Sequence, residues 1–144
     1  MTDAPCQAIT GPHRHKIRVY YEDTDFSGIV YHANTLKFFE RGRTEALRTC
    51  GVSHTDLLGR EAPLVFVVRK MDVAWLVPAK IDDLLEVRTR FVSVRGARMF
   101  LDQTLWHLDR QEKLAEATVE AACLSLAGRP RRLPDDVLAR LAAG

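Results

Sequence analysis

Hydrophobic and polar side chains alternate along several stretches of the chain, and this pattern predicts β-strands. In the first stretch, 15–23, Ile17, Val19 and Tyr21 alternate with more polar residues, as expected for a strand with one buried face. Four later stretches alternate in the same way or are rich in β-branched and aromatic residues, and these are 64–76, 85–91, 99–108 and 113–126. The last is rich in alanine and glutamate, which favour helices, but its alternation favours a strand, and we predict a strand.

A helical period replaces this alternation over 34–50. One stripe along this helix contains Leu36, Phe39, Arg43, Ala46, Leu47 and Cys50. Asn34 is expected to cap the helix by accepting a first-turn N–H, and Gly51 to end it in a left-handed conformation. Glycine in the middle of a helix destabilises it by about 1 kcal/mol relative to alanine. Gly42 at such a position therefore indicates that another backbone approaches the helix closely there. A short terminal helix is expected at 134–141, with Pro134 near its start.

The predicted elements are one strand, one long helix and four further strands joined by short turns, including a hairpin connection at 95–98. A five-stranded antiparallel sheet and a long helix that bury each other give an α+β fold. We expect residues 1–14 to form a flexible N-terminal arm and residues 15–144 to form a single domain. The open edges of such a sheet favour homo-oligomers formed by edge pairing.

Composition and charge narrow the functional classes. The 144 residues are 47% hydrophobic and 28% charged, which fits one globular domain. The 21 basic and 19 acidic residues leave a net charge of +2, too balanced to predict a nucleic-acid-binding protein. The chain has no signal-peptide pattern, and no apolar run approaches the roughly 20 residues that span a membrane. Three widely spaced cysteines without a CxxC predict neither a disulfide framework nor a metal site, so we expect a cytoplasmic protein.

The candidate chemistry lies where the first strand leads into the long helix, in the segment 20–34, which combines acidic residues, tyrosines, a histidine and a glycine. A helix N-terminus offers unpaired N–H groups that polarise a carbonyl and stabilise an oxyanion. A nearby carboxylate can attack that carbonyl or activate a water for the attack. Acyl transfer or hydrolysis is therefore the favoured chemistry. The alternative is that an aspartate before a helix serves only as a cap or turn former.

The segment 18–48, RVYYEDTDFSGIVYHANTLKFFERGRTEALR, resembles the signature of the hotdog-fold acyl-CoA thioesterases. It is most similar to the YbgC-type subgroup of the 4-hydroxybenzoyl-CoA thioesterase family, which is associated with the Tol–Pal system in many bacteria. The motif D-x-D-x-x-G-x-V-Y-H-x-N is present as Asp23, Asp25, Gly28, Val30, Tyr31, His32 and Asn34. The resemblance implies a five-stranded antiparallel sheet wrapped around one long central helix, and it covers about residues 15–128.

The resemblance also assigns roles to individual residues. Asp25 matches the catalytic carboxylate, as a nucleophile or as a general base toward water. The backbone N–H of His32 matches the group that polarises the thioester oxygen, and its side chain is a second catalytic candidate. For substrate binding, the resemblance implies that Tyr31 lines the pocket, that Gly28 lets the loop approach the substrate, and that Arg95 and Arg98 meet the phosphates of CoA. Asp23 is expected to orient the turn, and Asn34 to cap the helix rather than to catalyse.

The implied activity is hydrolysis of a short-chain, aromatic or other acyl-CoA to the free acid and CoA. No metal or redox cofactor is implied, because CoA is part of the substrate. The active site would lie at a subunit interface of a homodimer or homotetramer, and an acyl carrier protein is a further candidate partner. Two alternatives stay open: a non-catalytic adaptor of the Tol–Pal system that binds acyl-CoA or acyl carrier protein, peripheral to the inner membrane, and a hotdog hydratase or dehydratase.

Overall fold

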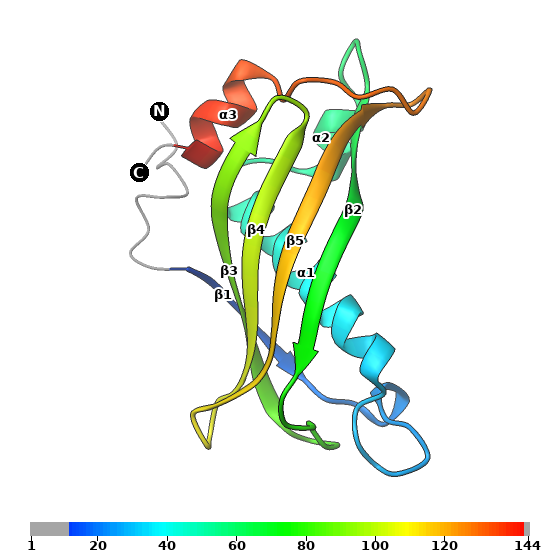
Figure 1. Cartoon of the computed structure of the whole chain (residues 1–144), viewed down its shortest axis with the longest axis vertical. Coiled ribbons are helices and arrows are strands. Elements are labelled where there is room, and N and C mark those ends of the chain that lie inside the picture. The colour runs from blue at the N-terminus through cyan, green and yellow to red at the C-terminus, as the bar shows by residue number, and fades with distance from the viewer. Residues whose placement is uncertain (1–11, 143–144) are drawn as a thin grey trace.

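The computed structural model describes residues 12–142 and contains one five-stranded antiparallel sheet, ordered β1-β3-β4-β5-β2 (Figure 1). The strands are β1 (His13–Arg18), β2 (Leu64–Trp75), β3 (Leu84–Arg95), β4 (Arg98–His107) and β5 (Glu112–Ser125). A 3-10 turn, η2 (Tyr21–Asp23), precedes the helices α1 (His32–Thr49), α2 (His54–Leu58) and α3 (Asp135–Ala142). In this part of the chain, β1 and β2 form the two open edges of the sheet.

Helix α1 lies along one face of the sheet, behind β4 and β5 in the view of Figure 1. Its buried side chains, among them Phe38 and Phe39, pack against inward-facing residues of the strands, because alternate strand residues point to the same face. Gly42 allows this contact: a Cβ there would collide with Cγ1 of Val87 on β3. Gln103 on β4 reinforces it by donating from Nε2 to the Phe39 carbonyl oxygen at 2.9 Å. A neighbouring strand therefore does approach Gly42 closely, but through the Val87 side chain, so the expected approach of another backbone is wrong.

The two ends of the sheet carry different structures. The β3–β4 hairpin, α2 and α3 lie at the upper end in Figure 1, and the segments 19–31, 76–83 and 108–111 lie at the lower end. The lower segments are joined to each other: the Val30 N–H donates to the Ala79 carbonyl oxygen at 2.8 Å, and His107 Nε2 lies 3.4 Å from Asp83 Oδ1. The lower end is therefore a connected frame around the N-terminus of α1.

The predicted α+β architecture is confirmed, with all five strands and the long central helix, but several boundaries differ. The first strand ends at Arg18, because Tyr21–Asp23 form the 3-10 turn. Strand β1 includes His13 and Arg14, which the sequence assigned to the N-terminal arm, whereas residues 1–11 of that arm lie outside the described residues. Helix α2 was not predicted, because its five residues are too short for a periodic signal.

Two predictions about single residues are wrong. Asn34 does not cap α1: the helix begins two residues earlier, and the Asn34 side chain instead donates from Nδ2 to the Asp23 carbonyl oxygen at 3.1 Å. Cys50 is disulfide-bonded, although the spacing of the cysteines favoured free thiols, whereas Cys123 is free and buried. No helix among residues 12–142 has the length and apolar character needed to cross a membrane.

Candidate active site

Asp23 shapes the loop that leads into α1. Its Oδ2 accepts the N–H of Tyr20 at 2.8 Å, and its carbonyl oxygen accepts the N–H of Tyr31 at 3.0 Å and the Asn34 side chain. These bonds link the start of the loop, its end and the first helical turn at one buried residue. Asp23 therefore orients the turn, as expected, and its carboxylate is engaged in doing so.

Asp25 lies in a tight turn that leaves part of its carboxylate free. Its Oδ1 accepts the N–H of Ser27 at 2.8 Å and the Ser27 hydroxyl at 2.6 Å, a local pattern that aspartate favours in turns. Among the described residues, its Oδ2 accepts no hydrogen bond. The bonds from Ser27 hold the pKa of the Asp25 carboxyl below its ordinary value, and the nearby His32 lowers it further. Asp25 is therefore a carboxylate at neutral pH with one oxygen available.

Gly28 closes the same turn. Its φ is +83°, a left-handed conformation that side-chain-bearing residues rarely adopt, and a Cβ there would meet nothing within 4 Å. The requirement for glycine is thus set by the backbone conformation and not by crowding. The Gly28 N–H donates to the Asp25 carbonyl oxygen at 3.0 Å, and the Asp25 N–H donates to that of Ile29 at 2.8 Å. The position of Asp25 is therefore determined by its immediate neighbours.

The N-terminus of α1 presents free donors beside this turn. In the described part of the chain, the N–H groups of His32 and Ala33 have no acceptor, as first-turn N–H groups do when no side chain caps them. The His32 ring lies 4.6 Å from the Tyr31 ring and 5.9 Å from the Trp75 ring, centroid to centroid. The helix end adds a positive partial charge at the same place.

A cavity of about 290 Å³ joins these features. Asp25, His32 and Thr35 contribute to it from the loop and helix, and the rest of its lining is mainly apolar: Ile29, Val30, Trp75, Leu76, Val77, Pro78, Ala79, Leu105, Leu114 and Ala115. A mostly apolar pocket with a few convergent polar groups is typical of a binding site for a small organic group. One carboxylate, free N–H donors and an apolar wall together suit a polarised carbonyl that carries an apolar substituent.

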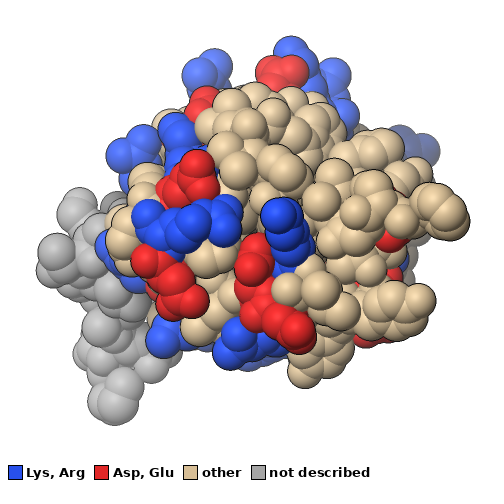
Figure 2. Space-filling model, turned by 90° about the horizontal axis from the view of Figure 1, so that it is seen from below, with Lys and Arg blue, Asp and Glu red and all other residues tan. Residues whose placement is uncertain are grey.

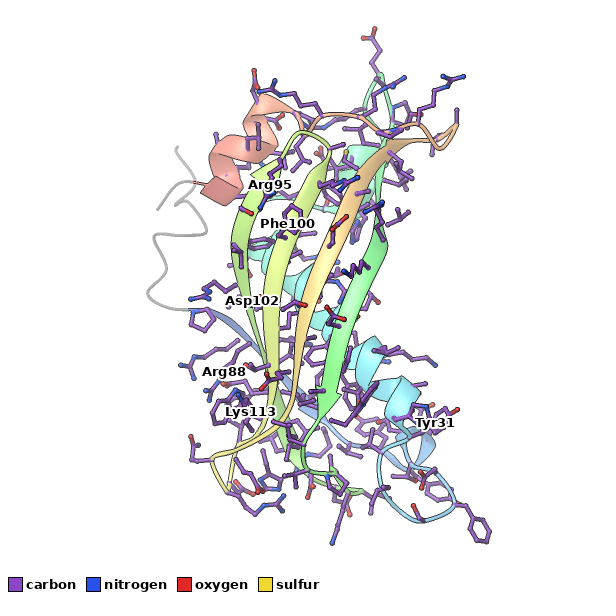
Figure 3. All side chains as sticks on the ribbon, in the orientation of Figure 1. Tyr31, Arg88, Arg95, Phe100, Asp102 and Lys113 are labelled. Carbon is purple, nitrogen blue, oxygen red and sulfur yellow. The ribbon has the colours of Figure 1, made fainter. Side chains whose placement is uncertain are left out.

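The remaining predicted site residues lie elsewhere in the single chain. Tyr31 is not among the residues that line the cavity; its side chain is 46% exposed and lies at the lower end of the molecule in Figure 3. Arg95 and Arg98 pair across the β3–β4 hairpin turn, which lies at the upper end, where Figure 3 labels Arg95. Strand β4 separates the hairpin from the lower end, and its 10 residues at about 3.3 Å each span about 30 Å. One chain therefore does not bring these arginines to Asp25.

The arginines of the hairpin are exposed and partly engaged. The Arg95 guanidinium lies 5.1 Å from the centroid of the Phe100 ring, and Arg98 Nη1 is 3.6 Å from Glu120 Oε2. Glu120 also contacts Arg69, at 2.6 Å. Because exposed ion pairs of this kind are weak, these arginines can exchange their present contacts for a phosphate group.

The surface around the loop is rich in aromatic residues. Figure 2 views the molecule from its lower end and shows a broad area without Lys, Arg, Asp or Glu beside a cluster of charged side chains. The most exposed apolar residues of the segment 20–31 are Tyr20, Tyr21, Phe26 and Tyr31, and Phe26 is fully exposed. Apolar surface of this extent beside a cavity is typical of an interface.

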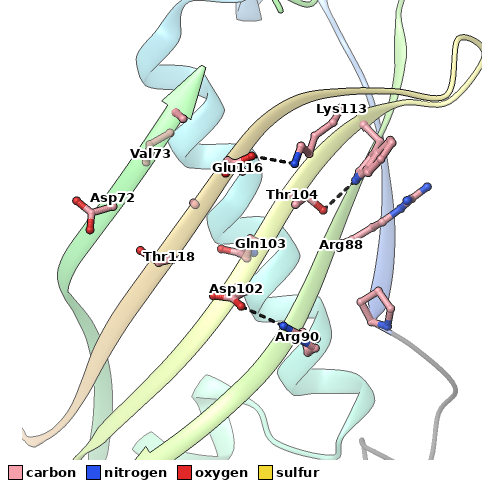
Figure 4. Close-up of a pocket in the computed structure, with 14 residues that line it drawn as sticks. Asp72, Val73, Arg88, Arg90, Asp102, Gln103, Thr104, Lys113, Glu116 and Thr118 are labelled. Carbon is pink, nitrogen blue, oxygen red and sulfur yellow. Dashed lines mark hydrogen bonds and ion pairs between the residues drawn. The ribbon is translucent and has the colours of Figure 1, made fainter. Parts of the chain in front are cut away.

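A second, larger hollow of about 620 Å³ lies on the face of the sheet turned away from α1 (Figure 4). Its charged side chains pair largely with each other: Arg90 with Asp102 at 3.2 Å, and Lys113 with Glu116 at 2.8 Å. It contains neither Asp25 nor His32. No group of three or more potential metal ligands occurs among residues 12–142.

Two residues that contact the candidate site residues were not predicted from the sequence. Ser27, which holds Asp25, had a local signal, because a serine two residues after an aspartate is a frequent turn pattern. Trp75, which contacts His32 from β2, had none, because the two residues are 43 positions apart.

Comparisons with known proteins show what the chain as a whole is similar to. A family model described as the thioesterase superfamily matches residues 27–114. The acyl-CoA thioesterase YbgC of Haemophilus influenzae is 45% identical, over 85% of this chain and 89% of that protein. The acyl-CoA thioester hydrolase YbgC of Escherichia coli O157:H7 is 42% identical, over 88% of this chain and 92% of that protein.

Solved structures give the same result for the fold. The crystal structure of a probable thioesterase from Bartonella henselae is 46% identical with a TM-score of 0.82, covering 86% of this chain and 100% of that chain. A 1,4-dihydroxy-2-naphthoyl-CoA thioesterase from Synechocystis has a TM-score of 0.84 at 19% identity, covering 92% of this chain and 97% of that chain. At that identity the second likeness shows only the fold, and it confirms the predicted arrangement of sheet and helix.

Proposed function

Because the chain belongs to the thioesterase superfamily, we propose that it hydrolyses the thioester of an acyl-CoA to the free acid and CoA. The resemblance to the YbgC-type subgroup is confirmed by the identity to two YbgC proteins. The observation that carries the proposal is the cavity in which the partly free Asp25 carboxylate and the N-terminus of α1 meet an apolar wall. The apolar wall receives the acyl group, and the helix N-terminus receives the carbonyl oxygen.

The reaction uses the two polar groups in sequence. The His32 N–H polarises the thioester carbonyl by a hydrogen bond to its oxygen. Attack at the carbon then places negative charge on that oxygen, which the same N–H stabilises. Asp25 either removes a proton from the attacking water or attacks the carbon itself to form an anhydride that water then opens. In both routes the C–S bond breaks, and the CoA thiolate leaves and takes up a proton. The lowered pKa of Asp25 suits either role, because both need the carboxylate.

The active site of this proposal is shared between two copies of the chain. Strand β2 is an open edge, and Val67, Val68 and Trp75 on it are exposed. Antiparallel pairing of two β2 edges would place the upper end of one subunit beside the lower end of the other. The partner's hairpin would then bring its arginines toward Asp25, which one chain cannot do. A homodimer is therefore the smallest working unit, and a homotetramer would hold two such units.

The substrate-binding roles follow from this arrangement. Arg95 and Arg98 would bind the phosphates of CoA, while Gly28 and Tyr31 would form the rim of the shared site. No cofactor is part of the mechanism, since CoA belongs to the substrate. An acyl carrier protein would present the same thioester and is the alternative carrier. We propose a cytoplasmic location, with peripheral attachment to the inner membrane as its alternative.

The experiment that tests the proposal is thiol release from a panel of linear, branched and aromatic acyl-CoAs, measured with a chromogenic thiol trap. The wild-type chain and Asp25→Asn are assayed together, with circular dichroism of both. We expect release by the wild type and a folded, nearly inactive variant. Tight binding of acyl-CoA without any release would instead support the adaptor of the Tol–Pal system. Hydration of an enoyl-CoA without thiol release would support the hydratase.

A further inference from the structure

Trp75 makes a specific contact with the first turn of α1. Its Nε1–H donates to the carbonyl oxygen of His32 at 3.2 Å. Its ring meets the His32 ring edge-on, with an interplanar angle of 88°. The same side chain lines the cavity that contains Asp25. One residue of β2 thus contacts the helix N-terminus, the imidazole and the proposed acyl pocket.

The backbone around Trp75 is fixed by hydrogen bonds to β5, so the position of the indole is defined. It ends β2, where it pairs with Ala115 of β5, and the following residues Leu76 and Val77 both donate their N–H to the Leu114 carbonyl oxygen, at 2.8 and 3.1 Å. The backbone on either side of the indole is therefore fixed to β5. Leu114 and Ala115 also line the cavity, so that the indole and its anchor enclose the same space.

The hydrogen bond acts on the donors of the helix. The peptide unit that contains the His32 carbonyl also contains the Ala33 N–H, which has no acceptor in the described part of the chain. A peptide that accepts a bond at its oxygen becomes a stronger donor at its nitrogen, because linked hydrogen bonds polarise one another. The indole also fixes the orientation of this peptide and, through it, the preceding His32 N–H. Both effects improve the site that receives the thioester oxygen.

The other tryptophan of the chain shows that this placement is not a general property of indoles here. Trp106 lies on the opposite face of the sheet, where its Nε1 donates to Thr104 Oγ1 at 2.9 Å and the Arg88 guanidinium lies 4.3 Å from its ring centroid. Among the described residues it contacts no helix N-terminus, and it lines the outer hollow and not the cavity that contains Asp25. Trp106 is therefore a matched control within the same chain.

We propose that Trp75 is a positioning residue for the N-terminus of α1 and the wall that sets the acyl preference of this site. The inference rests on the proposed thioesterase function and adds a determinant of substrate choice to it. The two roles are separable, because the hydrogen bond needs the indole N–H whereas the wall needs only a large flat side chain. Phenylalanine would keep the wall and lose the bond, and leucine would lose both.

The test compares Trp75→Phe, Trp75→Leu and Trp106→Phe on the acyl-CoA panel. Trp75→Phe should lower kcat about tenfold for every substrate and leave their relative kcat/KM unchanged, since one hydrogen bond is lost. Trp75→Leu should in addition raise kcat/KM for aromatic relative to linear acyl groups about tenfold, because the pocket is wider. Trp106→Phe should behave as wild type. Unchanged kcat in Trp75→Phe, or unchanged acyl preference in Trp75→Leu, overturns the corresponding role.

A binding measurement separates failure of this inference from failure of the proposed function. In the Trp106→Phe protein, Trp75 is the only indole, and its fluorescence should change when S-butyl-CoA, a thioether that is not hydrolysed, binds. Trp75→Leu should shift the Kd ratio of S-benzyl-CoA to S-butyl-CoA toward the benzyl ligand. If wild type releases no thiol but these shifts occur, the thioesterase proposal fails and the pocket wall stands. If thiol is released and the indole does not respond, the inference fails alone.

Discussion

Two hollows of the molecule, the outer hollow and the cavity that contains Asp25, differ in a way that their size and their number of charges do not reveal. The outer hollow is about twice as large, at about 620 against 290 Å³, and six charged residues line it. Five of them take part in ion pairs with other described residues. The smaller cavity has one acidic residue, but that carboxylate keeps an oxygen free and lies near unpaired N–H donors. We propose that reactivity requires a free carboxylate oxygen close to free N–H donors, and that the number of charges does not decide it.

The largest expected effect concerns the carboxylates of the two hollows. Asp25→Asn should lower kcat by a factor of about 10² to 10⁴, because the group that attacks or activates water is lost. Asp102→Asn is the matched change in the outer hollow, where it removes only an exposed ion pair with Arg90. We expect wild-type turnover from it in the thiol-release assay. Equal losses in the two variants would erase the distinction between the hollows.

The next largest effect is expected from removal of the backbone N–H of His32. Proline is tolerated at the first helical position, and the extended Tyr31 before it, with ψ at 131°, is compatible with a following proline. His32→Pro removes the N–H and the imidazole, whereas His32→Ala removes only the imidazole. We expect kcat to be about 10² to 10³ lower in the proline variant than in the alanine variant, the usual cost of one oxyanion donor. Equal kcat values would assign the effect to the side chain, and the thermal midpoint of each variant checks that the helix survives.

A smaller effect is expected at the hairpin. Replacing Arg95 and Arg98 together by alanine should raise KM for acyl-CoA about tenfold and leave kcat nearly unchanged, since contacts to phosphates are lost far from the reacting atoms. Arg90→Ala serves as the control, because Arg90 is an exposed arginine of the outer hollow. Steady-state kinetics at two salt concentrations measure this, and the difference should shrink at high salt. An equal rise in KM in the Arg90→Ala control would remove the hairpin from the proposed site.

The smallest expected effect is a shift in the pH dependence of kcat/KM. Ser27 holds the pKa of Asp25 down, so the carboxylate persists to lower pH in the wild type. Ser27→Ala removes the hydroxyl bond and keeps the backbone one, so the pKa of Asp25 should rise toward its ordinary value. The acid limb of kcat/KM should then move to higher pH by less than about one unit, with the plateau retained. A limb that stays in place would show that another group controls it.

The sequence predicted the fold well because its signals were local. Alternation, or a high content of β-branched and aromatic residues, identified every strand, including β5 despite its alanine and glutamate content, and the stripe along 34–50 identified α1. The errors occurred where the structure depends on contacts between distant residues or on short elements. The start of α1 was misplaced because Asn34 bonds to the Asp23 carbonyl instead of capping its own helix.

The candidate site likewise has a part that local sequence signals predicted and a part that depends on contacts between distant residues. The motif placed Asp25, Gly28 and His32 within eight residues of one another, and the structure adds why they fit together: a turn closed by Ser27 and a positive φ at Gly28. The walls of the cavity were not predictable, because Trp75, Leu105 and Leu114 come from three strands whose proximity exists only after folding. The catalytic roles of Asp25 and His32 are predictions that the variants above test.

This division has a consequence for how such an enzyme can change over evolutionary time. The groups proposed for bond cleavage belong to one continuous segment whose geometry is set by its own hydrogen bonds. The surfaces that would select the acyl group belong to other strands. Substitutions in those strands that leave Trp75 in place can alter which thioester is accepted without changing the proposed cleavage groups. We therefore expect the segment 25–32 and Trp75 to vary little among chains that share this chemistry, and the other strand residues around the cavity to vary more.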